Sequence, residues 1–142
     1  MTPDRASAGQ VVCVDLEQFR VEWTIPLPGS VLGAVAIAGD ELVWCCSDGT
    51  LHSGSLDGRS RRSLNTGAAI VASPAVTASH VYVVNFAGRL LAVERKTFQL
   101  AWSLPIGEPG PYTGSPIVAD GHIFVGTHRD GFVCVGPDED VR

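Results

Sequence analysis

The chain has 142 residues, of which 45% are hydrophobic and 18% charged, and its formal net charge is -5 at pH 7. This length fits one domain, and the composition excludes a mainly disordered chain. The negative charge argues against nucleic-acid binding, because that function usually needs a clustered basic face. The one basic run, Arg59 to Arg62, is explained by a solvated turn.

No apolar stretch reaches the roughly 20 residues that a membrane-spanning helix needs. The first ten residues lack the apolar segment of a signal peptide. We therefore expect a cytoplasmic protein without a membrane span. In that compartment its four cysteines are expected to be free thiols.

A repeat of about forty residues organises the chain. Gly9, Gly49, Gly88 and Gly131 are separated by 40, 39 and 43 residues, and a short alternating apolar segment follows each of them. Each period holds four short β-type runs divided by glycine, aspartate, asparagine or serine. No segment shows a sustained helical periodicity, so essentially no helix is expected. Four short strands in one such period are typical of a propeller blade.

The strands of each blade are named A to D from the innermost to the outermost. The first blade, about 9–26, has only strands C and D, at about 9–15 and 20–26. The second, 33–65, has strands near 33–38, 41–46, 50–56 and 60–65. The third, 73–104, has strands near 73–78, 80–85, 89–95 and 99–104. The fourth, 115–135, has strands A to C near 115–119, 122–127 and 131–135. The sequence thus predicts an all-β fold: one partial β-propeller domain over 1–142, with three and a quarter four-stranded antiparallel blades.

Side chains recur at matching offsets in these blades. The recurring positions are Ala92, Glu94, Thr97 and Trp102, then Cys13, Asp15 and Trp23, then Ser73-Pro74 and Ser115-Pro116, and finally Asp120, Gly121, Val125 and Gly126. The pattern resembles the repeat of the PQQ-like (pyrroloquinoline-quinone) β-propeller superfamily, roughly Ala-x-Asp-x-x-Thr-Gly-x-x-x-Trp followed by Ser-Pro and a DGxVYVG strand. Phe98 and Phe19 stand where that repeat has glycine.

The superfamily includes quinoprotein dehydrogenases, the lipoprotein that helps to assemble outer-membrane barrels, and propellers appended to kinases and to adenylate-forming enzymes. In this family the repeated tryptophans mainly lock neighbouring blades together. The resemblance therefore implies that Trp23 and Trp102 are structural blade-docking residues. It does not fix a function, because one fold hosts many functions.

Loops from strand B to C and from strand D to the next A share one face of a propeller, near the central channel. That face is predicted to carry the ligand-binding or partner-binding residues Cys46, Asn85, Tyr112, His128, Arg129 and Asp130. The irregular segment 107–114 is either a functional loop or a rigid surface turn. The turn 128–130 either holds an anion or is an ordinary turn that the aspartate caps.

Cys45 and Cys46 end strand B of the second blade. Strand alternation places them on opposite faces, which favours packing roles. A bond between them would be strained, because consecutive Cα atoms lie only about 3.8 Å apart. Some quinoprotein alcohol dehydrogenases nevertheless carry a bonded adjacent pair against the quinone. A redox role for Cys45 and Cys46 beside PQQ therefore remains an alternative.

The sequence has no nucleophile motif, no phosphate-binding loop and no set of ligands at metal-binding spacing. We therefore predict no catalytic residue, no metal site and no cofactor, since ligands for PQQ cannot be identified. Thirteen strands cannot close a ring of four to eight blades in the usual way. Open blade faces and strand edges drive association, so self-association or a protein partner is expected, without nucleic acid.

The chain is interpreted as a non-catalytic binding or scaffolding module of a larger or oligomeric propeller. Two alternatives stay open: a fragment of a PQQ-dependent quinoprotein dehydrogenase, and the C-terminal propeller of an adenylate-forming enzyme. The acidic ending, from Gly136 to Arg142, is read as a genuine C-terminus, which would put the missing strands on the N-terminal side.

Overall fold

The computed structural model describes residues 9–136, which form strands and connecting turns. Blade 1 consists of β1 (Gly9–Asp15) and β2 (Arg20–Leu27). Blade 2 consists of β3 (Ala36–Ala38), β4 (Glu41–Cys45), β5 (Thr50–Ser55) and β6 (Arg61–Asn65). Blade 3 consists of β7 (Ala75–Val76), β8 (His80–Asn85), β9 (Arg89–Glu94) and β10 (Gln99–Pro105). Blade 4 consists of β11 (Ile117–Ala119), β12 (His122–Gly126) and β13 (Phe132–Val135).

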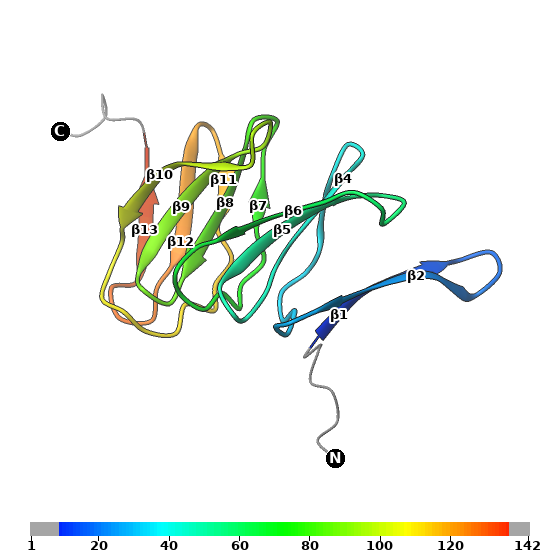
Figure 1. Cartoon of the computed structure of the whole chain (residues 1–142). Helices are drawn as coiled ribbons and strands as arrows, with labels where there is room; N and C mark the ends of the chain where they lie inside the picture. The colour runs from blue at the N-terminus through cyan, green and yellow to red at the C-terminus, as the bar shows by residue number, and fades with distance from the viewer. Residues whose placement is uncertain (1–8, 137–142) are drawn as a thin grey trace, which may run out of the picture.

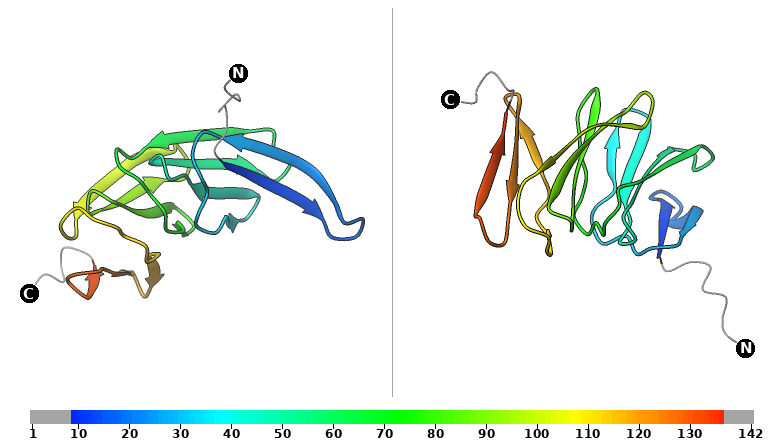
Figure 2. Two further views of the ribbon diagram at one scale, coloured as in Figure 1. Left: turned by 90° about the horizontal axis from the view of Figure 1, so that it is seen from below. Right: turned by 60° about the vertical axis from the view of Figure 1, so that its left-hand side comes forward.

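The four sheets follow one another in chain order along a curved row (Figure 1), and every neighbouring pair of strands is antiparallel. Figure 2 shows the first and last strands, β1 in blue and β13 in red, at opposite ends of this row. The predicted all-β partial propeller is therefore confirmed. Most of the first ten residues, in which no signal peptide is expected, lie outside the described residues. Nearly all of the acidic segment 136–142 lies outside them as well. Among residues 9–136 there is no helix that could cross a membrane.

The inner strands are shorter than the sequence suggests, because β7 begins at Ala75 and β11 at Ile117. The residues just before them are the Ser-Pro steps. The Ser73 N–H donates to the Ser115 hydroxyl at 2.9 Å instead of to a strand neighbour, and Pro74 has no N–H to donate. The Ala34 N–H donates to the Ser73 hydroxyl at 2.7 Å in the same way. These hydrogen bonds therefore connect successive blades at their inner ends.

The hydrophobic core lies between the blades, as three clusters. Val11, Ile25 and Leu27 of blade 1 pack on Leu42, Trp44 and Cys46 of blade 2. The other face of blade 2, with Val43, Cys45 and Leu51, packs on Val81, Val83, Leu91 and Val93 of blade 3. Val84 and Leu90 of blade 3 pack on Ile123 and Val125 of blade 4. β4, β8 and β9 thus send alternate side chains to two different neighbouring blades, which explains their nearly continuous apolar sequences.

The two phenylalanines in the family's glycine slot adopt the backbone conformation that favours glycine. Phe19 has a φ of 53° and Phe98 a φ of 54°, both in the left-handed region. Phe98 is buried at the interface of blades 2 and 3, whereas the Phe19 side chain is 84% exposed. The turn between strands C and D therefore keeps its shape in both blades although the glycine is absent.

Candidate functional site

The B–C turns and D–A loops gather on one edge of the blades, as the sequence predicts, and we call this edge the rim face. It consists of the turns 46–49, 86–88 and 127–131 and the loops 28–35, 66–74 and 106–116. Backbone hydrogen bonds join the two kinds of segment. Ser47 N–H donates to the Ser30 carbonyl at 2.8 Å, and Phe86 N–H donates to the Ala69 carbonyl at 2.8 Å. The B–C turns of blades 2 and 3 therefore each hold the D–A loop that precedes their own blade.

Cys46, Asn85 and Thr127 occupy the same position at the end of strand B in three blades. Asn85 is 1% exposed, its amide donates to the Thr66 carbonyl at 3.1 Å, and its carbonyl accepts from the Ala87 N–H at 3.1 Å. The Thr127 hydroxyl accepts from the Asp130 N–H at 2.9 Å. The structure thus places Asn85 and Thr127 as side chains that organise the rim turns.

The segment 107–114 packs against the last B–C turn. Tyr112 is 2% exposed, and its hydroxyl donates to the Glu108 carbonyl at 2.8 Å. Its ring lies edge-on to the ring of His128, with centroids 5.8 Å apart and planes at 84°. A Cβ on Gly110 would lie 2.7 Å from His128 Cε1, so any larger residue there would displace the His128 ring.

Burial raises the pKa of Tyr112, and the negative charges of Asp130 and Glu108 raise it further, while Arg129 opposes them. The structure therefore brings Tyr112 together with the 128–130 turn. It places Cys46 and Asn85 on the turns of the two preceding blades, both buried. Of the six predicted binding residues, the exposed ones are His128, Arg129 and Asp130.

A chain of polar side chains that the sequence reading missed follows the rim turn of blade 2. The Thr50 hydroxyl donates to Asp48 Oδ1 at 2.6 Å and lies 2.9 Å from His52 Nε2, which donates to it. His52 stacks on Trp44, with centroids 5.5 Å apart and planes at 6°. Burial lowers the pKa of His52, Asp48 counteracts this and Arg61 adds to it. The alternate spacing of Asp48, Thr50 and His52 on one strand face is the signal that would have predicted the contact.

The two adjacent cysteines are free thiols; Cys45 ends β4 and Cys46 follows it, and they lie on opposite faces of blade 2. Cys45 belongs to the cluster between blades 2 and 3, and Cys46 to the cluster between blades 1 and 2. Burial raises the pKa of both thiols above the ordinary value of 9.0; the negative charge of Asp48 adds to this at Cys46, and a hydrogen bond with Thr50 opposes it there. Both sulfurs therefore lie as protonated, packed groups in this structure.

The two repeated tryptophans differ in their surroundings. The Trp23 indole N–H of blade 1 donates to the Leu56 carbonyl of blade 2 at 3.2 Å, and its ring lies against Gly58. Trp102 of blade 3 lies beside Tyr82 of its own blade, with centroids 6.0 Å apart, and is 38% exposed. The difference has a structural reason, since the described part of blade 4 has no C–D turn for Trp102 to contact.

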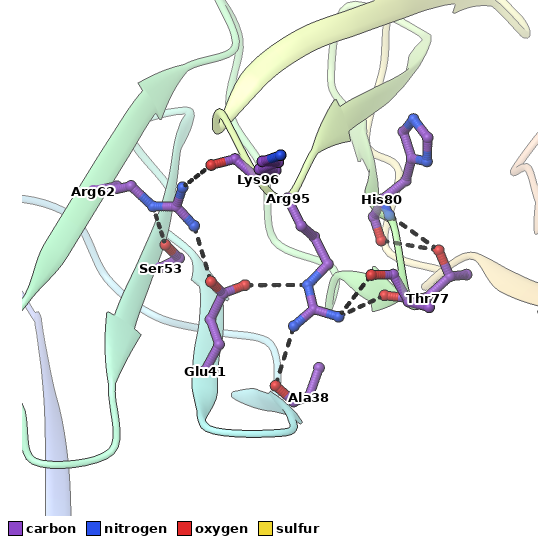
Figure 3. A network of polar contacts seen from close by, with 9 residues as sticks. Ala38, Glu41, Ser53, Arg62, Thr77, His80, Arg95 and Lys96 are labelled. Carbon is purple, nitrogen blue, oxygen red and sulfur yellow. Dashed lines mark hydrogen bonds and ion pairs between the residues drawn. The ribbon is translucent and has the colours of Figure 1, made fainter.

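Opposite the rim face, an ionic network joins blades 2 and 3 (Figure 3). Glu41 accepts from Arg62 at 2.9 Å and from Arg95 at 3.3 Å. Arg95 also donates to the carbonyls of Ala38 and Thr77, at 3.1 and 2.8 Å. Arg62 lies over the Phe98 ring, 4.9 Å from its centroid. The sequence reading assigned Arg62 to a solvated turn and missed this network.

Residues 9–136 contain no group of three or more His, Cys, Asp or Glu side chains placed to hold a metal ion. Two shallow hollows lie at the edge opposite the rim face. One, of about 250 Å³, is lined by residues of blade 2 that include Glu41, Ser53 and Arg62; the other, of about 720 Å³, lies beside Trp23 and Arg59. Both are open to solvent and neither is formed by the predicted binding residues.

Comparisons with known proteins agree with this fold. BamB from Moraxella catarrhalis superposes with a TM-score of 0.77 at 20% identity, over 90% of this chain and 40% of the BamB chain. The computationally designed Ika8 protein gives 0.77 at 15% identity, over 92% and 41%. Quinohemoprotein alcohol dehydrogenase from Comamonas testosteroni gives 0.62 at 18% identity, over 76% and 18%. At these identities the likeness concerns the fold alone.

The chain spans about two fifths of the lengths of the two structures that match it over nine tenths of its own length. Comparison with curated proteins finds no match at the sequence level. A family model with the description outer membrane protein assembly factor BamB matches residues 52–139, which is more than half of the chain. On this match, and on the PQQ-like repeat that the blades carry, the chain belongs to the BamB family of PQQ-like repeat propellers.

Proposed function

We propose that the chain is a non-catalytic, protein-binding segment that works within a larger or oligomeric propeller. The observation that carries the proposal is the exposure of large apolar side chains at the two ends of the blade row. In blade 4, Ile117 is 61% and Phe132 71% exposed, and in blade 1, Val14 is 49% and Val21 56% exposed. Contiguous apolar surface of this kind marks an interaction site in a folded protein.

Two further observations support a binding role. The family description, outer membrane protein assembly factor, fits a protein that has protein partners. The rim face offers an exposed polar turn, His128 to Asp130, held in place by the buried Tyr112. We propose the rim face as the contact surface for a partner, because turns placed on a rigid sheet scaffold are common binding elements.

Adding PQQ and Ca²⁺ to the purified chain distinguishes a non-catalytic binding segment from a fragment of a quinoprotein dehydrogenase. The proposal expects no chromophore retained after desalting, no rise in melting temperature and no dye-linked alcohol oxidation. A retained chromophore with turnover would overturn it. Light scattering coupled to size exclusion tests the association, for which a mass above 14.9 kDa is expected.

A further inference from the structure

The outer face of blade 4 corresponds, residue by residue, to faces that blades 2 and 3 bury against the next blade. The register pairs Phe124 with Ile117 and Cys134, and Gly126 with Phe132. The positions equivalent to Phe132 are Leu51 and Leu90, both 0% exposed, whereas Phe132 is 71% exposed. We call Ile117, Phe124, Phe132 and Cys134 the tail face.

The outer face of blade 1 corresponds in the same way to a face that meets a preceding blade. Cys13 pairs with Trp23 as Ala92 pairs with Trp102, and a bulge follows each pair. Val12 and Val14 are therefore equivalent to Leu91 and Val93, which are 4% and 0% exposed against blade 2. Val12 and Val14 are 40% and 49% exposed. We call Val12, Val14 and Val21, the strand partner of Val14, the head face.

Resting on the proposed function, we infer that the tail face of one chain docks on the head face of a second copy. Three pairs of successive blades pack on each other within the chain. In each pair, the face equivalent to the tail face packs on the face of the next blade that is equivalent to the head face. A second copy would supply a head face for the tail face of blade 4 and a tail face for the head face of blade 1. The contact is head-to-tail, and it extends the inter-blade packing already present in the chain.

The side chains at the open ends are suited to each other in size. The tail face is bulkier than its equivalents, with Ile117 in place of Ala36 and Ala75, and Phe132 in place of leucine. The head blade is thinner, because its described part consists of β1 and β2 without the two inner strands. The larger tail side chains would offer more apolar area to β1 and β2 than their smaller equivalents would.

The length of one chain indicates how many copies a closed ring would hold. One chain spans 40% of the BamB chain that it superposes on, so two copies correspond to about four fifths of such a chain. Head-to-tail contacts either close into a ring or continue as an open fibre. A closed dimer therefore curves more tightly than a BamB chain, and it is the assembly in which two copies cover both tail faces and both head faces.

The experiment uses the full chain and two charged variants at exposed positions, Val14→Asp on the head face and Phe132→Asp on the tail face. Leu16→Asp, at a 78% exposed position in the turn between β1 and β2, is the matched control. Each is measured by light scattering after size exclusion, with circular dichroism and a urea midpoint to verify folding. We expect a dimer for the wild type and the control. Each face variant alone should dissociate at least tenfold more readily.

The decisive sample is an equal mixture of the two face variants. One intact junction remains between the wild-type tail of Val14→Asp and the wild-type head of Phe132→Asp, so the mixture should regain a 1:1 complex. If either variant alone kept the wild-type mass, or if the mixture stayed monomeric, head-to-tail docking would be overturned while the proposed binding module would stand. A wild type that is monomeric at every concentration would contradict self-association itself, and the quinone test above would be unaffected.

Discussion

Arg95 of blade 3 reaches back to blade 2, where its Nε lies 3.3 Å from Oε1 of Glu41. The two residues are 54 positions apart in the chain. The same carboxylate holds Arg62 at 2.9 Å, so one acidic side chain connects the outer strand of its own blade to the next blade. The Arg95 guanidinium also donates to backbone carbonyls of both blades, which fixes its direction.

Replacing Glu41 by glutamine should lower stability, because two guanidinium groups that are partly shielded from water lose their negative partner. The side chains of Glu41 and Arg95 are 19% and 20% exposed, so we expect a loss of about 1–2 kcal/mol, between the values for surface and buried ion pairs. Urea unfolding of Glu41→Gln measures the loss. Asp40→Asn, one position away on an exposed turn, serves as the control and should change stability by less than about 0.5 kcal/mol. Equal losses in the two variants would show that the network contributes nothing.

Replacing each left-handed phenylalanine by glycine should have opposite effects at the two sites. At Phe19 the side chain is exposed, so relief of backbone strain outweighs the flexibility of glycine and stability should rise by about 0.5 kcal/mol. At Phe98 the same relief is exceeded by the loss of a buried ring that packs under Arg62, and stability should fall by about 3 kcal/mol. Thermal unfolding of both variants tests the contrast. A large loss at Phe19 would mean that its ring is packed.

Stability should fall as the pH drops below the ordinary histidine range. Burial holds the pKa of His52 in the folded chain below its ordinary value of 6.5, so the unfolded chain binds a proton that the folded chain does not. The stability from neutral His52 is therefore complete above pH 6.5 and is lost as the pH falls through the lowered pKa. His52→Phe, which keeps a ring on Trp44, should show a smaller difference in unfolding free energy between about pH 7.5 and about pH 5. An unchanged difference would contradict this assignment.

The four thiols should divide into two classes of reactivity. Cys134 is exposed and Cys13 partly exposed, whereas Cys45 and Cys46 are buried. A thiol reagent should label two groups in the native chain and all four after unfolding without reductant. Only two groups after unfolding would indicate a bond between Cys45 and Cys46. Because Cys134 belongs to the tail face, its labelling should also slow as the protein concentration rises.

The blades could be predicted because their sequence signals are local. Apolar alternation and turn residues recur at a fixed period, and each strand is recognised from its own residues and the turns on either side of it. The sequence also predicted Tyr112 and the 128–130 turn on one face, whereas the contact between Tyr112 and His128 is known from the structure alone. The inner strands are shorter than predicted, because the Ser73 N–H donates to the Ser115 hydroxyl of the next blade instead of to a neighbouring strand.

The contacts that sequence reasoning missed are those that depend on the angle between blades. Glu41 and Arg95 meet because two turns from successive blades lie side by side, and no spacing in the sequence encodes that distance. The His52 contact was missed for a different reason. Its partners were sought as metal ligands, while the structure uses Thr50 to connect the ring to Asp48.

The central claim is that the open ends of the blade row make this chain associate. The most direct measurement is the molar mass of the unmodified chain by light scattering over a wide range of concentration. We expect a mass of 14.9 kDa in dilute solution, and a mass of about twice that value at higher concentration. A mass that stays at 14.9 kDa at every concentration would contradict it.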